Sequence, residues 1–391
     1  MGCASSSSTA TQTVQTPTQR RRLSVGHVED TGIDERIDTM EEDRGLITSL
    51  NASTLMELLK DDNAPGGRKF SIGSQTDQAK TSFANKTMNH LGDDIDVVSS
   101  GLGYTCRKGL KPESPNQDSW MVLKVDGDFS IYGVFDGHGK QGHDISNYVK
   151  DMLPKLILRD QRFKTADMPS MLMDCFKRVQ NLINTMDRMK KLSAQMSGTT
   201  ATIVVHDHSQ QKITVAHVAD STCVLGSLDG KNVQGISLTR DHKPNLKDER
   251  ARIEKAGGRV VFDGYANHRV YAKNARYPGL NMSRCLGDLM GHADAGCSCE
   301  PEVSERKLTS EDTVLLLCSD GVWEFISSQE AVEMVARRSP AQAMNTADYL
   351  AKEAWDRWIQ EEGGAVVDDI TVVLVYLQQQ SQNGGLPPLP P

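Results

Sequence analysis

The sequence predicts an α+β fold in which helices cover antiparallel sheets. Short runs with alternating apolar residues dominate from about residue 95, which is the pattern of half-buried strands. The helical patterns come as long blocks rather than one after each strand, which disfavours a doubly wound parallel sheet. No repeat of fixed period is visible, which disfavours a solenoid or a propeller.

The expected elements are defined by their apolar periodicity. Strands are expected at residues 120–125, 129–135, 199–206, 212–219, 223–228, 314–318 and 370–377. Helices are expected at residues 143–158, 169–191, 247–255, 329–337 and 341–361. The last helix carries Trp355 and Trp358, which we expect to pack on its buried face.

Composition restricts the class of protein. A chain of 391 residues has room for one large or two ordinary domains, and 38% apolar with 25% charged residues is typical of a soluble protein. A net charge of -8 and a pI near 5.7 argue against a general nucleic-acid binder, because phosphate backbones attract a basic surface. No apolar run approaches the length of a membrane span.

The cysteines indicate a reducing compartment. Eight are scattered along the chain without the rhythm of a disulfide framework, and no secretory signal precedes them. Cys297 and Cys299 are separated by one residue, but no second Cys or His pair stands at zinc-finger spacing. We therefore predict free thiols.

The first residues match a signal for lipid attachment. Met1-Gly2-Cys3-Ala4-Ser5-Ser6 fits the myristoylation pattern with Gly2 as the acylated terminus, and Cys3 can accept palmitate. One myristoyl chain binds membranes weakly, so stable attachment needs the second signal. We expect the acylated protein at the cytoplasmic face of a membrane, with the plasma membrane favoured. Without acylation, we expect it in the cytoplasm. The sequence Arg21-Arg22-Leu23-Ser24 also fits a basophilic-kinase site at Ser24.

Both ends of the chain are predicted to lack a packed core. Residues 1–85 are rich in Ser, Thr, Gln, Asp and Gly, so we expect a disordered, acylated tether. Within it, residues 46–60 carry a leucine stripe that can dock on the catalytic domain or a partner, or form a transient helix. The domain is expected at 86–378. Residues 379–391 form a Pro-rich tail, which we expect to be unstructured.

Carboxylates at strand ends carry the chemistry. Asp136 follows one expected strand, Asp320 follows another, and Asp368 precedes a third. If the three converge, their charges repel one another unless cations lie between them, and all-oxygen ligands favour Mg²⁺ or Mn²⁺. Two such ions can activate water against a phosphate ester, and His138 can protonate the leaving oxygen. Each acid alone is more often a turn residue.

Eight short motifs then occur in one order between about residues 97 and 377. They are Pro115-Asn116-Gln117-Asp118-Ser119, Val134-Phe135-Asp136-Gly137-His138-Gly139, Ser197-Gly198-Thr199-Thr200-Ala201, Val218-Ala219-Asp220-Ser221, Leu238-Thr239-Arg240-Asp241-His242-Lys243-Pro244, Met282-Ser283-Arg284-Cys285-Leu286-Gly287-Asp288, Cys318-Ser319-Asp320-Gly321-Val322-Trp323-Glu324 and Asp368-Asp369-Ile370-Thr371. In this order they resemble the type-2C, metal-dependent serine/threonine protein phosphatases.

The resemblance implies an α-β-β-α sandwich with two metal ions in a cleft at one end of the sheets. By motif position, Asp136 would bridge both ions and the Gly137 carbonyl would bind one, while Asp320 and Asp368 complete the other shell. Family members hydrolyse phosphoserine and phosphothreonine in phosphoproteins by direct attack of metal-activated water. The neighbouring Asp369 is not the family ligand. We expect a monomer.

Further roles also follow only from the resemblance. Asp118 would hold metal-bound water through hydrogen bonds, and His138 would be the general acid. Asp220 matches a position linked in some members to a third, weaker ion. Glu324 stands where a common Asp would be and is a longer candidate ligand for that ion.

The chain departs from the family pattern around the phosphate. Gln117 replaces a frequent acidic residue, and Glu113 stands where an Arg often binds the substrate phosphate. Three neighbouring basic residues can take that role, and the sequence does not choose among Arg107, Lys108 and Lys111.

A flap at residues 267–296 is expected, by resemblance, to shape substrate choice as a mobile loop. Two other functions stay open. A catalytically weak pseudophosphatase would act as a membrane-anchored binding module, but intact acids disfavour it. A metal-dependent nuclease would need a more basic surface.

Overall fold

The computed structural model describes the backbone of residues 31–50, 54–60, 67–76, 86–111, 115–230 and 232–377, and their side chains except at 31–39 and 54. The chain divides into two compact units, residues 1–41 and 42–391, and the fold below is that of the second. The predictions for Gly2, Cys3, Ser24, Glu113 and residues 379–391 lie outside the described residues.

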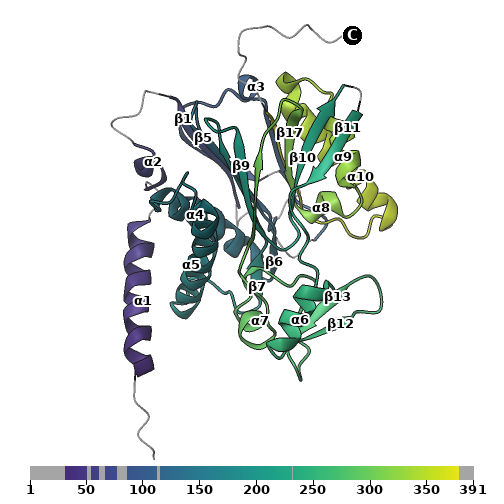
Figure 1. Ribbon diagram of the computed structural model, residues 1–391. Helices are drawn as coiled ribbons and strands as arrows, with labels where there is room; N and C mark the ends of the chain where they lie inside the picture. The colour runs from purple at the N-terminus through teal and green to yellow at the C-terminus, as the bar shows by residue number, and fades with distance from the viewer. Residues whose placement is uncertain are drawn as a thin grey trace, which may run out of the picture. The chain divides into compact units, whose positions relative to one another are not determined.

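Two antiparallel sheets form the centre of the fold (Figure 1). The seven-stranded sheet has the order β16 (Glu302–Lys307), β9 (Lys212–Val218), β8 (Ala201–Asp207), β5 (Phe129–Phe135), β4 (Ser119–Val125), β1 (Lys69–Gln75) and β2 (Thr87–Gly92). The five-stranded sheet has the order β11 (Asn232–Ser237), β10 (Thr222–Asp229), β17 (Asp312–Cys318), β18 (Ile370–Tyr376) and β3 (Leu102–Arg107).

An apolar core lies between the two sheets. It joins residues of the larger sheet, such as Val122 and Val204, with residues of the smaller one, such as Leu315 and Val373. Alternate residues of each strand therefore face this core, as the period-two pattern requires. The rings of Tyr104 and Trp120 stack within it, with centroids 4.3 Å apart.

Helices cover the outer face of each sheet, which confirms the predicted fold class (Figure 1). The helices α4 (Gly142–Arg159) and α5 (Met168–Arg188) bury their apolar stripes on the seven-stranded sheet. The helices α9 (Ser328–Val335) and α10 (Ala343–Glu361) do the same on the five-stranded sheet, and a short 3₁₀ turn, Pro340–Gln342, precedes α10. Trp358 packs into this layer as expected, and its indole N–H donates to the Gly321 carbonyl.

Small elements complete the fold, and most of them lie at one end of the sandwich, opposite α3 (Val97–Ser100) (Figure 1). β6 (Gly137–Gly139), β7 (Ser197–Thr199) and β15 (Leu286–Gly287) form a three-stranded sheet, and β12 (Arg259–Phe262), β13 (His268–Tyr271) and β14 (Pro278–Leu280) form another. The short helices are α3 (Val97–Ser100), α6 (Lys247–Lys255), α7 (Leu289–Asp294) and α8 (Asp320–Trp323). The predicted flap therefore contains strands and a helix, where the sequence suggested a loop.

The predicted start of the domain at residue 86 is wrong. β1 pairs with β4, placing Lys69 opposite Val125, so the large sheet already includes residues from 69 onward. The stretch at residues 46–60 is two helices, α1 (Thr31–Ser49) and α2 (Thr54–Leu58), rather than one. Leu50, Leu55 and Leu59 are buried in the apolar cluster that also includes residues of α4 and α5. Within the described chain, no helix is both long and apolar enough to span a membrane.

Candidate active site: an acidic centre at one end of the sandwich

The strand registers bring the predicted acids to one end of the two sheets. Asp136 directly follows β5, and Asp118 directly precedes its antiparallel neighbour β4, in which Ser119 pairs with Phe135. In the other sheet, Asp320 begins α8 just after β17, and Asp368 lies just before β18, whose Val372 pairs with Cys318. Because antiparallel neighbours begin where their partners end, acids far apart in sequence share one edge.

The acids interact strongly with one another. Burial, followed by the charges of Asp118, Asp320 and Asp368, raises the pKa of Asp136 well above its usual value. The pKa of Asp320 is raised in the same direction, by burial and then by the charge of Asp368, and the Asp136 and Asp320 carboxyl groups are within hydrogen-bonding reach. Such a group of carboxylates needs positive charge nearby to stay ionised.

Asp118 is fixed from one side and left open on the other. Its Oδ2 accepts hydrogen bonds from Ser319 Oγ and Thr371 Oγ1, each at 2.7 Å. Its Oδ1 is buried and has no partner among the described residues. Burial, followed by the charge of Asp369, raises the pKa of Asp118 to about 7.

The neighbouring acids Asp368 and Asp369 have different surroundings. The Asp369 carboxylate accepts from the backbone N–H groups of Gly109 and Gln117, each at 2.7 Å, and so fixes two loops. The Asp368 carboxylate is partly exposed, contacts the Lys111 ammonium and contributes its charge at Asp136 and Asp320. The geometry is therefore consistent with Asp368 as the acid that serves the centre.

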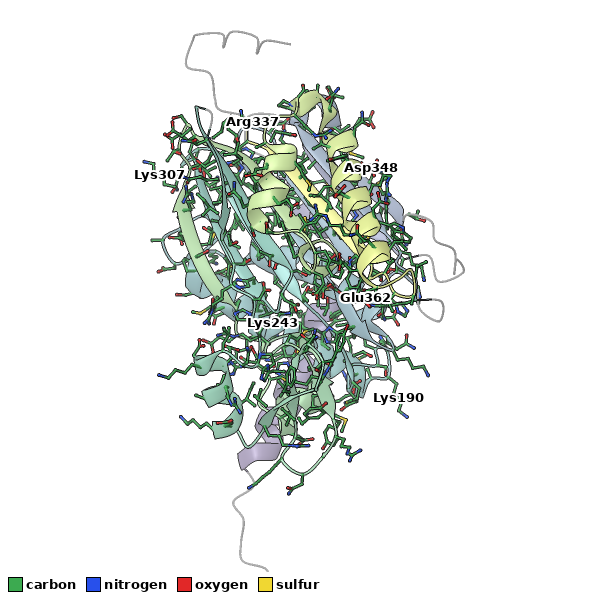
Figure 2. All side chains as sticks on the ribbon, turned by 90° about the vertical axis from the view of Figure 1, so that its right-hand side faces the viewer. Lys190, Lys243, Lys307, Arg337, Asp348 and Glu362 are labelled. Atoms are coloured by element: carbon green, nitrogen blue, oxygen red, sulfur yellow. The ribbon has the colours of Figure 1, made fainter. Side chains whose placement is uncertain are left out.

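The three candidate phosphate-binding residues separate clearly. Lys111 is the one whose ammonium lies in the acidic centre, where it contacts Asp368. Lys108 is buried and donates to backbone carbonyls of Gly109 and Lys111. Arg107 forms an ion pair of 3.3 Å with Asp348, which Figure 2 labels on α10. Lys108 and Arg107 are thus held by other partners.

A second lysine lies beside the centre. The ammonium of Lys243, labelled in Figure 2, contacts the buried carboxylate of Asp220. Asp220 in turn adds its charge at Asp320 and at Asp241. Glu324, at the end of α8, adds its charge at Asp241 as well. The candidate third-ion residues Asp220 and Glu324 therefore both lie near Asp241. A third ion at this position stays a prediction.

His138 is held by an acid that the sequence analysis did not assign. Its Nε2 lies 2.5 Å from Oδ2 of Asp288, whose side chain is 1% exposed. Burial alone would lower the pKa of His138, but the Asp288 charge and hydrogen bond raise it above the ordinary value. In the sequence, Asp288 is only the last residue of a motif that lies 150 positions from His138. The pairing of strands that brings the two residues together is a tertiary feature, which the sequence does not display.

The donor set fits hard divalent cations. All predicted ligands are oxygen atoms, as Mg²⁺ and Mn²⁺ prefer. Oδ1 of Asp320, like Oδ1 of Asp118, is buried without a hydrogen-bond partner in the described part of the chain. Gly137 fits because a side chain there would collide with backbone, with a Cβ 2.6 Å from the Gln117 carbonyl oxygen. A cation near these atoms would supply the charge that the cluster lacks.

A half-buried acidic centre at one end of an α-β-β-α sandwich is the type of site that a metal-dependent phosphohydrolase uses. Comparison with known proteins identifies the family within this class. The family model described as "Protein phosphatase 2C" matches residues 112–362. The chain therefore belongs to the protein phosphatase 2C family, which consists of protein serine/threonine phosphatases.

Individual relatives agree. "Probable protein phosphatase 2C 72" of Arabidopsis thaliana is 32% identical over 75% of this chain and 90% of its own length. "Probable protein phosphatase 2C 61" of the same plant is 34% identical over 74% of this chain and 89% of its own. The solved serine-threonine phosphatase 2C from Toxoplasma gondii shares the fold, with a TM-score of 0.59 at 22% identity, covering 67% of this chain and 90% of that one.

Proposed function

We propose that this phosphatase is active and uses two Mg²⁺ or Mn²⁺ ions held by Asp136, the Gly137 carbonyl, Asp320 and Asp368. The observation that carries the proposal is the half-buried pair Asp136 and Asp320, whose carboxyl groups lie within hydrogen-bonding reach with no cation of the described chain contacting either. When bound, the ions would activate water and neutralise the phosphoryl group for direct hydrolysis of phosphoserine or phosphothreonine.

The chain's own residues supply the remaining steps. Lys111 would contact the substrate phosphate, because its ammonium already lies beside Asp368. His138 would hold the proton that passes to the leaving serine or threonine oxygen, and Asp288 would keep that imidazole oriented and protonated. Ser319 and Thr371 fix Oδ2 of Asp118, which leaves its buried Oδ1 without a partner among the described residues and available to hold a metal-bound water.

A catalytically weak pseudophosphatase is the second candidate. It would grip phosphoproteins without turnover. The presence of Asp136, Asp320 and Asp368 at one edge of the sheets favours the active enzyme, since loss of a ligand is the simplest route to an inactive member.

The test compares two aspartates in the full-length chain. Hydrolysis of a phosphothreonine peptide should require Mn²⁺, stop with a chelator and fall by at least about a hundredfold in Asp320→Asn. The matched control is Asp356→Asn, whose exposed carboxylate pairs with Lys352 on α10. Direct Mn²⁺ binding, measured by electron paramagnetic resonance, should weaken in the first variant only. Metal-independent hydrolysis, or full activity of Asp320→Asn, would contradict the proposal.

We also propose that acyl chains on Gly2 and Cys3 tether the enzyme to the cytoplasmic face of a membrane. The support is the sequence Met1-Gly2-Cys3-Ala4-Ser5-Ser6. Intact mass of the N-terminal peptide from cells should show myristate, and Gly2→Ala should move the protein from the membrane to the soluble fraction. Cys3→Ser should leave myristate in place and weaken attachment. A wild-type peptide without an acyl group would remove the proposal.

A further inference from the structure

Two compact groups of metal-ligand side chains occur among the described residues, and neither contains the predicted Mg²⁺ ligands. One is His138, Cys285 and Asp288, and the other is His217, His242 and Glu302. In each group, one donor atom per residue lies within 4.8 Å of the others. The first group, here called the thiol–imidazole cluster, includes the proposed proton donor.

The thiol–imidazole cluster is assembled by the small sheet β6, β7 and β15. His138 pairs with Gly198 on one side, and Gly287 pairs with Gly198 on the other. Two strand spacings are about 9.6 Å, so the His138 and Asp288 side chains meet only by reaching across the middle strand. Gly198 leaves that space open, because a Cβ there would lie 2.2 Å from Oδ2 of Asp288.

The donor spacing is close to that of a zinc site. Zn–S near 2.3 Å and Zn–N near 2.0–2.1 Å place sulfur and nitrogen about 3.5 Å apart in a tetrahedron. The three donors already lie within 4.8 Å of one another, so modest rotations close the shell. Nε2 of His292 on α7 is 3.9 Å from Sγ of Cys285, but it donates to the Cys285 carbonyl at 3.1 Å, so the fourth position is left for water.

The chemistry of these donors selects zinc over the catalytic ions. A thiolate, imidazole nitrogen and one carboxylate oxygen are typical zinc ligands, whereas Mg²⁺ and Mn²⁺ prefer oxygen alone. Cys285 is buried and free of any disulfide. His138 is 20% exposed, which gives an ion a path from solvent.

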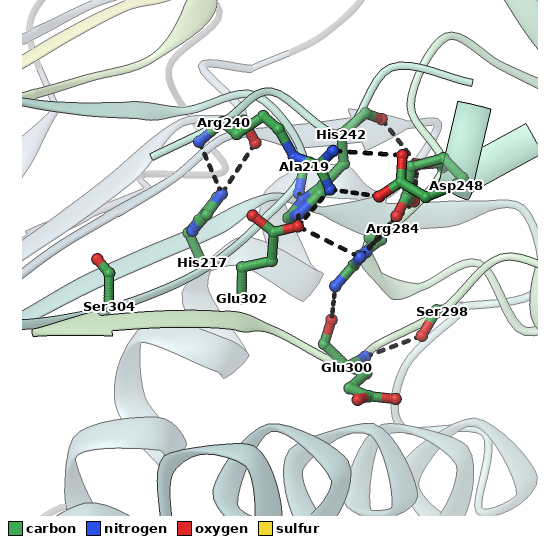
Figure 3. Close-up of polar contacts among 12 residues, drawn as sticks. His217, Ala219, Arg240, His242, Asp248, Arg284, Ser298, Glu300, Glu302 and Ser304 are labelled. Carbon is green, nitrogen blue, oxygen red and sulfur yellow. Dashed lines mark hydrogen bonds and ion pairs between the residues drawn. The ribbon is translucent and has the colours of Figure 1, made fainter. Parts of the chain in front are cut away.

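The second group differs because two guanidinium groups already lie against its carboxylate (Figure 3). Nε2 of His217 is hydrogen-bonded to the Arg240 backbone at 2.9 Å. Glu302 contacts both the Arg240 and Arg284 guanidinium groups. Nδ1 of His242 accepts a backbone N–H at 3.0 Å, so the neutral ring carries its proton on Nε2. A cation there would face two fixed positive charges, so we assign no metal to it.

We propose that the thiol–imidazole cluster binds one Zn²⁺ through His138, Cys285 and Asp288, with water as the fourth ligand, and that this ion inhibits the phosphatase. When zinc binds, the Cys285 thiol proton and the proton between His138 Nε2 and Asp288 are both released to solvent. Inhibition follows because zinc occupies the imidazole nitrogen and the carboxylate that otherwise hold the transferable proton. Zinc binding stands on the geometry alone, whereas its inhibitory effect rests on the proposed function of His138.

Binding is tested on the full-length chain saturated with Mn²⁺, with Zn²⁺ titrated against a chromophoric chelator. The wild type should retain one Zn²⁺ that excess Mn²⁺ does not displace. Cys285→Ser should weaken the zinc affinity by at least about tenfold, because loss of a group that only hydrogen-bonds to a metal ligand already costs that much. The control is Cys175→Ser, a buried thiol on α5 that lies 3.5 Å from the Met171 sulfur, and it should bind as the wild type does. Unchanged zinc affinity in Cys285→Ser, or release of zinc by Mn²⁺, overturns the site.

A second readout covers the case in which Cys285→Ser does not fold. Co²⁺ bound to the wild type should show a thiolate charge-transfer band in the near ultraviolet, and its absence overturns the site. In activity assays, Zn²⁺ should inhibit phosphothreonine-peptide hydrolysis more than hydrolysis of p-nitrophenyl phosphate, whose leaving group needs no proton. Zinc bound without this difference overturns the inhibitory effect. A chain that binds zinc but never hydrolyses phosphate refutes the proposed function instead.

Discussion

The contact between His138 and Asp288 makes the most direct prediction about the chemical step. Asp288→Asn keeps the shape of the side chain but removes its negative charge. The wild-type carboxylate is 2.5 Å from Nε2 and is almost fully buried, so water screens the interaction little. Without it, the imidazole loses both its orienting partner and the charge that raises its pKa.

The size of the effect follows from the strength of that contact. A hydrogen bond to a charged group contributes about 1.5–3 kcal/mol, and each 1.36 kcal/mol is tenfold in rate. We therefore expect kcat on a phosphothreonine peptide to fall roughly 10- to 150-fold in Asp288→Asn, with KM nearly unchanged. On p-nitrophenyl phosphate, kcat should fall less than about threefold, because a good leaving group departs without a proton.

The assay compares both substrates in parallel at saturating Mn²⁺. His138→Ala should reproduce the pattern, and the double variant should be little worse than either single one, since the two residues act as a unit. Asp294→Asn serves as control at the other end of α7, where the carboxylate accepts from the exposed Tyr277 hydroxyl at 3.0 Å. An equal fall on both substrates would show that Asp288 supports the fold or the ions rather than proton transfer.

Three further predictions concern stability and substrate binding. Burial raises the pKa of Glu249, but hydrogen bonds led by Arg284 lower it to about 2 from 4.5, so this stabilisation is present above pH 4.5 and is lost toward pH 2. Between these pH values the free energy of unfolding of Glu249→Gln, measured by circular dichroism, should therefore fall by about 3 kcal/mol less than that of the wild type. Gly103→Ala places a Cβ 2.1 Å from a carbonyl oxygen of α10 and should cost about 1–3 kcal/mol in urea unfolding; wild-type stability would contradict the contact. Lys111→Ala should raise KM for a phosphopeptide about tenfold while Arg107→Ala changes it less than about twofold, and the reverse order would reassign the phosphate contact.

Strongly periodic segments could be predicted from the sequence because their burial pattern is local. The predicted strand at residues 129–135 coincides with β5, whose residues are all buried. The predicted helix at 247–255 coincides with α6. The apolar run before Asp320 likewise gave β17. The position of an acid beside such a strand is therefore readable without a structure.

The start of the domain could not be read in this way. β1 has the sequence KFSIGSQ, in which polar and glycine residues dilute the strand pattern. It is held in place by pairing with β4 and by burial of Phe70 and Ile72 in the core between the sheets. Tertiary pairing thus determines a strand whose own residues only weakly predict one.

The cysteines show most clearly which contacts cannot be predicted from spacing along the chain. Spacing along the chain predicted no zinc-finger arrangement around Cys297, because such motifs place their ligands on neighbouring turns. The donors near Cys285 come instead from His138, on a strand that pairs with the opposite edge of β7. Their proximity depends on Gly198, a residue with no chemistry of its own. Replacing Gly198 with Ala should therefore disturb both the His138–Asp288 contact and zinc binding, whereas neither effect can be inferred from the spacing of the ligands in sequence. If Gly198→Ala keeps full phosphopeptide turnover and the cobalt band, the two side chains do not meet across β7.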